Sequence, residues 1–522
     1  MIFRNDKPEI QVPNSDLTSI VLSKVDELGD KAALIDGPTG RTLTYTQLRT
    51  QIRHLAAGLN QRGFKKGDVC AVFCPNIPEY ATIFLGVAAV GGINTTINSL
   101  YSTNDLIHQF KDSGAKILIT IPAFMDRALP AAQECGIKEI FVLGEAENAT
   151  AFSELLNNPG IPPKVTIDPK RDLVALPYSS GTTGLSKGVM LTHENLSSNM
   201  VLSESINPLI DEDLMVGVLP FFHIYGMVLI LNLAIYRGVT LVTMPRFDLE
   251  QFLQIIEDYK ISTLSLVPPL VLALAKHPLV DKYDTSSIRL ISSGAAPLGS
   301  EIEEACAERL GCQIYQGYGL TEVSGACHVN SVPVPAEKTG AVGRVLPNTY
   351  SKVIDTETGA ELGINERGEV LIKGMHIMVG YLNNDDATKH CIDEDGWFHS
   401  GDIGYADEDG YFYIVDRLKE LIKYKAYQVA PAELEALLVS HDAIADAAVV
   451  PSPDEEAGEI PKAFVVLKGD ISAEEIMSWV ANEVAPHKKI RKLEFVDEIP
   501  KSASGKILRR VLVEQERANI NS

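Results

Sequence analysis

Short segments that are apolar at every position alternate with helical patterns along most of the chain, and this alternation restricts the fold more than any other feature. Residues 69–73 (Val-Cys-Ala-Val-Phe) are the clearest example, and the helical pattern of 79–90 follows them. Strands that are apolar on both faces are buried on both faces, as in parallel sheets covered by helices. The sequence therefore predicts the α/β class.

The pattern changes near residue 340 and again near residue 417. Short strands separated by turns predict a small antiparallel or barrel-like unit at about 340–417. The remaining residues mix helices and strands and have the length of an independent small domain. We therefore expect an N-terminal domain over 1–417 and a C-terminal domain over 418–522.

Composition excludes several classes of protein. The chain of 522 residues has a formal net charge of −23, which argues against a nucleic-acid-binding protein or one held on anionic lipid. Its seven cysteines are scattered without a C-x-x-C pair, so neither a disulfide framework nor a zinc site is supported. No segment has the apolar length of a signal peptide or a membrane span, and we expect a cytoplasmic location.

A glycine-rich loop at 178–188 (Tyr-Ser-Ser-Gly-Thr-Thr-Gly-Leu-Ser-Lys-Gly) is the strongest chemical signal. Glycines let backbone N–H groups approach an anion, hydroxyl groups add donors, and Lys187 adds a positive charge. The alternative is a flexible polar surface loop. The loop is not a Walker A motif, because Ser186 precedes the lysine, Gly188 follows it, and a strand is expected at 189–192. A different nucleotide-binding fold is implied.

Two further elements carry acidic residues. Glu322 ends a predicted Gly-rich turn at 316–322, where it could hold Mg²⁺ beside phosphates or cap a helix N-terminus. Asp402 could accept hydrogen bonds from ribose hydroxyls with Arg417 beside it. Their alternative is a turn aspartate and a surface salt bridge.

Lysine and histidine residues give weaker signals. Lys506 follows Ser-x-Ser-Gly in a loop of small residues, so it could enter a cleft and neutralise charge on a reacting carboxylate and phosphate, or it could be an exposed helix lysine. His223 lies between aromatic residues, where a core histidine is the commoner outcome and a role in lining a substrate tunnel is the alternative.

Six segments, read together and in order, resemble the adenylate-forming superfamily of acyl-CoA synthetases, non-ribosomal peptide adenylation domains and beetle luciferases. The segments are 178–188, 293–297, 316–322, 400–402, 416–425 and 500–506. Within the superfamily, residues 219–226 (Leu-Pro-Phe-Phe-His-Ile-Tyr-Gly) and 419–433 are most similar to 4-coumarate:CoA ligases and their bacterial relatives.

The resemblance implies a fold and a reaction. The fold is a large N-terminal domain of two α/β sandwich subdomains plus a small distorted β-barrel, followed by a small mobile α+β C-terminal domain with its hinge at Lys419. In the reaction a carboxylate attacks the α-phosphate of Mg-ATP and pyrophosphate leaves, and CoA thiol then displaces AMP. The implied ligands are a small-molecule carboxylic acid, ATP, CoA and Mg²⁺, on a monomer or homodimer.

By position, the resemblance also assigns roles to residues of the nucleotide site. The glycine loop would hold the β- and γ-phosphates through Ser179, Ser180, Gly181, Thr182, Thr183, Gly184 and Lys187. Adenine would lie against Gly294, Ala295, Ala296, Gln316, Gly317, Tyr318 and Gly319. Thr321 would meet the α-phosphate, Glu322 the magnesium, and Asp402 with Arg417 the ribose.

Each step is expected to use its own lysine. Lys506 would serve adenylate formation, and Lys423 with Gln428 would act in thioester formation or contact AMP. The residues expected to act in catalysis are Lys506, Lys423, Glu322, His223 and Thr183. Those expected to line the acid pocket are His223, Tyr225, Leu229, Gly294, Gly319, Gly325, Ala326 and Val329. Contacts to CoA are expected from Arg246, Lys425 and Ala426.

Departures from the family pattern bear on the substrate. Gly325 and Ala326 stand where plant coumarate ligases commonly have Pro and Val, and Leu229 replaces a small polar residue. A roomier and more apolar pocket follows, so an unsubstituted cinnamic or other aryl acid, or a medium-chain fatty acid, is at least as well supported as a hydroxycinnamic acid. Alternatives are a stand-alone enzyme that loads a carrier-protein thiol and a luciferase-like activity.

Overall fold

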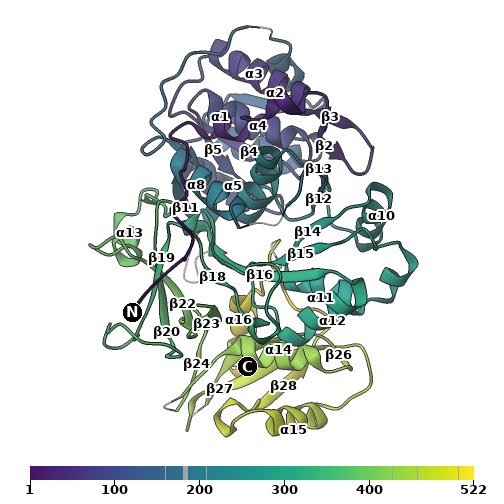
Figure 1. Ribbon diagram of the computed structural model, residues 1–522, viewed down its shortest axis with the longest axis vertical. Coiled ribbons are helices and arrows are strands. Elements are labelled where there is room, and N and C mark those ends of the chain that lie inside the picture. Colours follow the sequence, from purple (N-terminus) through teal and green to yellow (C-terminus); the bar gives the residue numbers. More distant parts are fainter. Residues whose placement is uncertain are drawn as a thin grey trace.

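The computed structural model describes residues 1–158, 160–179, 186–206, 209–425, 427–454, 456–503 and 505–521. In this part of the chain the strands form four sheets, two large and two small. Figure 1 shows the large sheets in the upper and middle parts of the molecule and the C-terminal sheet at the bottom. The architecture confirms the predicted mixed α/β class with a separate C-terminal domain.

The first sheet has a parallel centre, and an antiparallel hairpin extends it at one edge. Within the described residues its order is β10 (Tyr178–Ser179), β11 (Lys187–Thr192), β9 (Leu173–Ala175), β5 (Ile93–Thr96), β4 (Val69–Phe73), β6 (Ile117–Thr120), β7 (Glu139–Val142) and β8 (Thr150–Ala151), with β21 (Gly380–Tyr381) paired to β11. Cys70 and Val72 of β4 belong to one core and Ala71 and Phe73 to another, because successive side chains of a strand face opposite sides.

Helices cover both faces of this sheet, as the doubly apolar strands predicted. The first core takes residues from α3 (Tyr45–Gln61) and α4 (Glu79–Ala89). The second takes residues from α5 (Thr103–Ser113) and α6 (Met125–Glu134). Smaller helices in the N-terminal part are α1 (Leu17–Val21), α2 (Val25–Leu28) and α7 (Ser153–Leu156).

The second large sheet carries most of the candidate site. Its order, again for the described residues, is β18 (Arg344–Val345), β17 (Gly325–Val329), β16 (Gln313–Leu320), β15 (Leu290–Ser293), β14 (Thr263–Leu266), β12 (Leu214–Gly217), β13 (Thr240–Thr243), β2 (Ala32–Asp36) and β3 (Thr42–Thr44). Its helices are α8 (His193–Glu204), the π-helix η2 (Tyr225–Asn232), α9 (Leu233–Arg237), α10 (Leu249–Tyr259), α11 (Pro268–Lys276) and α12 (Ser300–Leu310).

One local prediction in this sheet was wrong. Residues 316–322 were expected to form a turn, but β16 continues to Leu320 before a short 3₁₀ turn, Thr321–Val323. The extension is stabilised by antiparallel pairing with β17, in which Gly317 lies opposite Val329 and a bulge follows Tyr318. Glycines in a strand often mark such a bulge or a close approach, and here they were misread as turn residues.

The two small sheets complete the molecule. The third is antiparallel, β1 (Ile2–Arg4), β19 (Tyr350–Ile354), β20 (Gly368–Lys373), β22 (Phe398–Ala406) and β23 (Phe412–Arg417), so its edge strand comes from the N-terminus. A short helix, α13 (Asp385–Cys391), lies between β21 and β22 in the chain. The fourth contains β25 (Tyr427–Val429), β24 (Ile422–Tyr424), β27 (Gly458–Leu467), β26 (Ile444–Asp454) and β28 (Lys492–Phe495), with helices α14 (Pro431–Ser440), α15 (Ala473–Glu483) and α16 (Arg509–Asn521).

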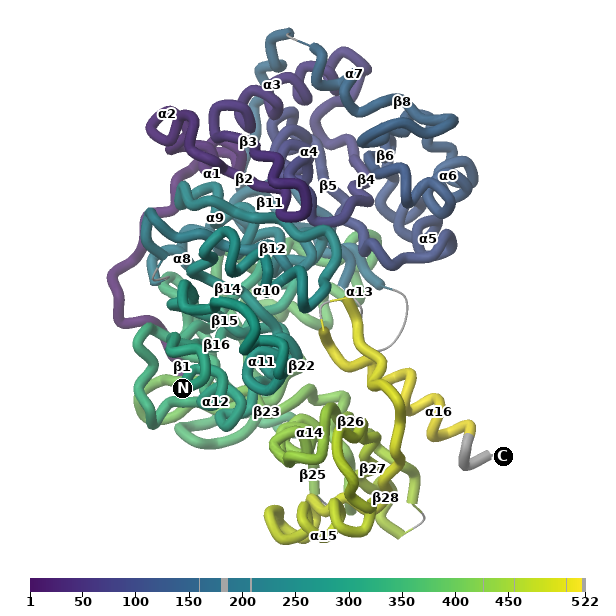
Figure 2. The backbone as a smooth tube through the Cα atoms, turned by 90° about the vertical axis from the view of Figure 1, so that its right-hand side faces the viewer, coloured from purple at the N-terminus to yellow at the C-terminus, as the bar shows by residue number. Residues whose placement is uncertain are grey.

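The C-terminal domain has its own core, made by β24–β27 with α14 and α15. It contacts the third sheet through Asp416 of β23, whose carboxylate accepts a hydrogen bond from the backbone N–H of Ala432. In Figure 2 the yellow segment before α16 rises from this domain alongside the N-terminal part. The chain passes between the two parts at 418–421, which agrees with the expected boundary, although the boundary itself stays a prediction.

No helix within the described ranges is both long and apolar enough to cross a membrane. The seven cysteines are free, and Cys70, Cys74, Cys306 and Cys327 are buried. The predicted cytoplasmic location and the monomeric or dimeric state stay predictions.

The buried side chain of Asn76 links the two large sheets, together with Thr96 of β5, whose Oγ1 donates to the carbonyl oxygen of Phe222 at 2.8 Å. Asn76 follows β4, and its Nδ2 donates hydrogen bonds to the carbonyl oxygens of Gly217 (2.8 Å) and Leu219 (2.7 Å). Its Oδ1 accepts from the backbone N–H of Phe221 at 2.8 Å. Asn76 thereby fixes the turn between β12 and η2, which leads into the candidate site.

We predict that Asn76→Ala lowers the free energy of unfolding by about 2–4 kcal/mol, because it leaves buried backbone groups without partners. The urea midpoint of the first unfolding transition measures the loss. Asn60→Ala, at an exposed position of α3, is the control and should leave the midpoint unchanged. An unchanged midpoint in Asn76→Ala would show that the link between the sheets lies elsewhere.

Candidate active site

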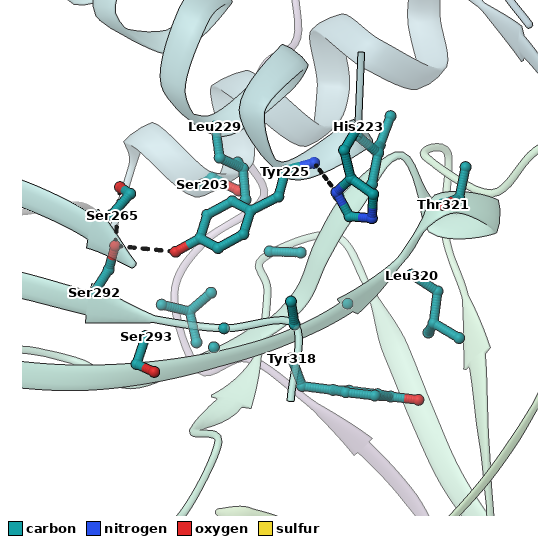
Figure 3. A pocket seen from close by; sticks show the side chains of 18 of the residues that line it. Ser203, His223, Tyr225, Leu229, Ser265, Ser292, Ser293, Tyr318, Leu320 and Thr321 are labelled. Carbon is teal, nitrogen blue, oxygen red and sulfur yellow. Dashed lines mark hydrogen bonds between the residues drawn. The ribbon is translucent and has the colours of Figure 1, made fainter. Parts of the chain in front are cut away.

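A deep pocket lies between η2 and the ends of β14, β15 and β16 (Figure 3). It encloses about 800 Å³, its open mouth included. Predicted residues that line it are His223, Tyr225, Leu229, Gly294, Ala295, Gly317, Tyr318, Gly319, Thr321, Gly325, Ala326, Val329 and Lys506. Lining residues that sequence reasoning missed include Ser203, Leu233, Ser265, Ser292 and Tyr315. The ends of parallel strands thus meet at the pocket, as expected for ligand sites in open sheets.

The π-helix η2 carries the upper wall of the pocket. Gly226 allows the helix to begin against the preceding turn, because a Cβ there would lie 2.1 Å from the carbonyl oxygen of Pro220. Tyr225 and Leu229 point from this helix toward the strands in Figure 3. Burial, with the nearby charge of Lys506, lowers the pKa of His223 to about 3, so His223 is neutral and its Nδ1 accepts a hydrogen bond from the backbone N–H of Tyr225.

Hydroxyl groups line part of the pocket, which the sequence patterns did not predict. The hydroxyl of Tyr225 lies 3.2 Å from Oγ of Ser292, which in turn donates to Oγ of Ser265 at 3.0 Å. Ser203 is buried, and its Oγ has no hydrogen-bond partner among the described residues. Leu229, Ala326 and the backbone of Gly325 supply apolar wall, as expected. The pocket therefore combines apolar walls with a short chain of hydroxyl groups.

Lys506 reaches the pocket from the far end of the sequence. It is held by a tight turn in which its backbone N–H donates to Oγ of Ser502 at 3.1 Å and its carbonyl accepts from the Ser502 N–H. Burial lowers the pKa of Lys506 to about 8, and the positive charge of Arg417 adds to the effect. Carboxylates of Asp402, Glu322 and Glu420 oppose this shift, so all four charged side chains lie within electrostatic range of the lysine.

Asp402 and Arg417 are direct neighbours on the third sheet. They lie opposite each other on β22 and β23, and Arg417 Nε is 3.6 Å from Oδ1 of Asp402. The hydroxyl of Tyr318 donates to the other carboxylate oxygen at 2.6 Å. Burial nevertheless raises the pKa of Asp402. The antiparallel register of β22 and β23 therefore places the side chains of Asp402 and Arg417 next to each other.

Of the residues predicted for the nucleotide and CoA sites, Ser180, Gly181, Thr182, Thr183, Gly184 and Ala426 lie outside the described residues. Ser179 and Lys187 face each other across the β10–β11 hairpin.

Glu322 meets this hairpin from the end of β16. Its Oε1 accepts hydrogen bonds from Ser179 Oγ at 3.0 Å and from the hydroxyl of Tyr381 at 2.8 Å. The ammonium of Lys187 lies 4.5 Å from the centre of the Tyr381 ring. Sequence reasoning missed Tyr381, because nothing in the local pattern shows that residues 380–381 return to pair with β11.

Gln316 has a different environment from the other residues assigned to adenine. Its amide nitrogen donates to Oε2 of Glu303 at 2.6 Å and to the carbonyl of Leu298 at 3.1 Å. Gln316 therefore supports the turn after β15, which includes Gly294, Ala295 and Ala296, from behind. Ala295 adopts a positive φ of 71° in this turn.

Several predicted residues lie away from the pocket. Lys425 forms an ion pair with Glu456 at 2.7 Å, and Lys419 is exposed in the connection between β23 and β24. Lys423 is exposed, and Arg246 is exposed after β13. Gln428 lines a second cavity between the small sheets. The structure thus brings Lys506 to the pocket and leaves the lysine expected for the second step outside it.

Comparisons with known proteins cover nearly the whole chain. A family model described as AMP-binding enzyme matches residues 23–382, and one described as AMP-binding enzyme C-terminal domain matches residues 433–506. The chain belongs to the AMP-binding enzyme family.

This chain is similar in sequence to named members of the family over nearly its whole length. A 4-coumarate–CoA ligase of Petroselinum crispum is 45% identical over 524 residues, which cover 98% of this chain and 96% of the relative. A 4-coumarate–CoA ligase of Pinus taeda is 43% identical over 98% of this chain and 97% of the relative. The crystal structure of an anthranilate–CoA ligase in complex with anthranoyl-AMP superimposes with a TM-score of 0.91 at 25% identity, covering 98% of this chain and 99% of that one. These findings confirm the resemblance to adenylate-forming enzymes close to 4-coumarate:CoA ligases.

A substitution of Gln316 tests how the turn after β15 is held in place. Burial raises the pKa of Glu303, and the hydrogen bond from Gln316 opposes that rise. We predict that Gln316→Ala destabilises the fold by about 1–3 kcal/mol at pH 8 and by less at pH 5. The loss of stability is larger at pH 8 because the variant raises the Glu303 pKa further. This part of the free-energy cost arises only at a pH where the Glu303 carboxyl must be ionised.

Urea unfolding at the two pH values measures this difference. The double variant Glu303→Gln/Gln316→Ala is the control, since it has no carboxyl to ionise and should lose the pH dependence. A loss of the same size at both pH values in the single variant would mean that Gln316 acts without Glu303.

Proposed function

We propose that this protein is an ATP-dependent carboxylic acid–CoA ligase that activates an aryl or cinnamic acid as its adenylate and then transfers the acyl group to CoA. The observation that carries this proposal is Lys506 in the wall of the pocket that Thr321 also lines, within electrostatic range of Asp402 and Arg417. Relatives named as 4-coumarate–CoA ligases over the whole chain support the same activity.

Adenylate formation follows from the charges around the pocket. A carboxylate oxygen of the acid attacks the α-phosphorus of ATP, and the bond to pyrophosphate breaks, so negative charge concentrates between acid and phosphate. An ammonium group fixed at that point stabilises the transition state more than the separated reactants. Lys506 is the cation that the pocket offers there, and the open end lined by Tyr318 and Thr321 would receive the nucleotide.

Glu322 fits a magnesium ligand. Magnesium is usually held by one or two carboxylates together with substrate phosphates. Oε1 of Glu322 is held by Ser179 and Tyr381, and none of the described residues hydrogen-bonds to its Oε2. When bound, the ion would reduce the charge of the departing pyrophosphate. Lys187, which faces Ser179, would contact the same phosphates.

Thioester formation requires a different arrangement of the C-terminal domain. The CoA sulfur attacks the acyl carbonyl and AMP leaves with both bonding electrons. Lys423 and Gln428 lie outside the pocket here, whereas Lys506 is inside it. We infer that the domain turns about the connection at Lys419, which would exchange one lysine for the other and bring Arg246, Lys425 and Ala426 toward CoA.

The acid pocket favours an aromatic acid. Leu229, Leu233 and Ala326 form apolar wall, and Tyr225 lies across the pocket from the strands. Flat rings pack well between such surfaces, and the hydroxyl chain through Ser292 could accept a polar substituent. A substituted aryl or cinnamic acid combines both properties, whereas the tail of a fatty acid offers no polar group to these hydroxyls or to Oγ of Ser203, which has no partner among the described residues.

We predict acid-dependent release of pyrophosphate with cinnamic and aryl acids, and AMP release only when CoA is added. A screen over aryl, cinnamic and C6 to C16 fatty acids, with and without CoA, measures both products. A phosphopantetheinyl carrier protein and luciferin serve as competing arms. Preference for the carrier thiol, light emission, or no release with any acid would each contradict the proposal.

We predict that Lys506→Ala reduces ATP–pyrophosphate exchange at least about 100-fold, the scale of losing one charge-stabilising group in an active site. Thioester formation from supplied acyl-adenylate should survive, because the second step uses the other arrangement. Lys501→Ala is the matched control. Lys501 belongs to the same loop as Lys506, but it forms an ion pair with Asp446 and lies away from the pocket. Equal loss of both steps would contradict the division of labour.

The pKa of Lys506 gives a pH dependence. Because the pKa is lowered to about 8, the ammonium form is complete below that pH in the free enzyme and is lost above it. We predict that kcat/KM for adenylate formation falls above about pH 8, since kcat/KM reports groups of the free enzyme. Lys506→Arg should move the fall to higher pH, and an identical profile in that variant would assign the fall to another group.

A further inference from the structure

Four side chains meet at the base of the glycine loop, Ser179, Lys187, Glu322 and Tyr381, and Cys391 lies beside Tyr381. Tyr381 contacts both charged residues through its side chain, because its hydroxyl donates to Glu322 Oε1 at 2.8 Å and its ring lies 4.5 Å from the Lys187 ammonium. Ser179 connects the other two, since it donates to the same carboxylate oxygen and faces Lys187 across the hairpin.

Tyr381 is held rigidly in this position. It is 8% exposed and pairs with Val189 of β11 through the short strand β21. Its backbone N–H donates to Oγ1 of Thr388 at 2.9 Å. The N–H of Leu382 donates to the carbonyl of Gly188 at 2.8 Å, directly after the loop. The ring is therefore fixed to the same strand that carries Lys187.

The position of the ring keeps opposite charges apart. Within the described part of the chain no ion pair joins Lys187 to Glu322, although both touch Tyr381. An ammonium and a carboxylate this close to one residue would otherwise attract each other directly. A direct pair would neutralise both groups and occupy the carboxylate oxygen that a cation needs. The aromatic face offers the ammonium a weaker, replaceable partner.

We propose that Tyr381 is a positioning residue that separates Lys187 from Glu322 and keeps each available, the lysine for phosphate and the carboxylate for the cation that accompanies it. The hydroxyl orients Glu322 by holding Oε1, and the ring holds the Lys187 ammonium. This proposal rests on the proposed function, in which ATP and its divalent cation bind at this loop.

Two substitutions separate the two contacts. Tyr381→Phe keeps the ring and removes the hydrogen bond, and Tyr381→Leu removes both. The probes are Mn²⁺, followed by electron paramagnetic resonance in the presence of α,β-methylene-ATP, and the same nucleotide analogue titrated calorimetrically in EDTA. AMP binding is measured as well, because AMP lacks the phosphates that Lys187 would contact.

For Tyr381→Phe we expect Mn²⁺ affinity to fall about tenfold, the size of one hydrogen bond to a charged group, with analogue binding in EDTA changed less than about twofold. For Tyr381→Leu we expect the same loss for Mn²⁺ and an additional loss of about threefold to tenfold for the analogue in EDTA. AMP affinity should be unchanged in both variants.

Tyr45→Phe is the matched control, because it removes a buried tyrosine hydroxyl that donates to the carbonyl of Val239 at 2.8 Å, far from the loop. It should alter thermal stability without altering either binding constant. Unchanged Mn²⁺ affinity in Tyr381→Phe, or equal analogue affinity in both Tyr381 variants, would overturn the proposal. Normal Mn²⁺ and analogue binding by the unchanged protein without acid-dependent pyrophosphate release would instead count against the proposed function alone.

Discussion

The pocket depends on a balance between two partly buried cations and a buried carboxylate. Lys506 and Arg417 both lie near Asp402, and the negative charge of Asp402 opposes the cost of burying each cation. Burying an unpaired charge costs far more than a folded protein can usually tolerate. The lysine can therefore enter the pocket only where Asp402 and Glu322 already provide negative potential. The C-terminal domain adopts this position because the N-terminal domain supplies that charge.

A second charge cluster lies within the C-terminal domain, close to the pocket. Arg509, three residues after Lys506, contacts Glu420 of the connecting segment and Glu435 of α14. Burial raises the pKa of Glu435 to about 7 and that of Asp416 to about 6, while the charge of Arg509 opposes both shifts. The same short segment thus carries the cation that enters the pocket and the cation that ties the last helix to α14 and the connection. Because Glu420, Glu435 and Arg509 all follow Lys419 in the chain, a rotation about that residue can withdraw Lys506 while these ion pairs stay intact.

Sequence patterns predicted the elements well where a local signal existed. Strand 69–73 and the helix after it follow from apolar periodicity, which local sequence specifies directly. The strand β16 was misread at 317–320, because its pairing partner β17 decides its conformation and is not a local property. Lys506 was predicted through the resemblance of its loop, whereas Tyr381 and Ser203 were missed because only tertiary structure brings β21 and α8 to the site. Long-range register is therefore the information that the sequence patterns lacked.

The geometry of the glycine loop explains why it differs from a Walker A loop. A Walker A loop leads into a helix, whose N-terminus adds partial positive charge along the phosphates. Here the loop joins the antiparallel strands β10 and β11 and leads into a strand instead of a helix, so the positive charge is expected to come from side chains. Lys187 supplies positive charge from the hairpin itself, and Lys506 supplies it from the C-terminal domain. Charge on a separate domain can be withdrawn after the first half-reaction, whereas a helix dipole cannot, and an enzyme that must release pyrophosphate before admitting a thiol gains from that difference.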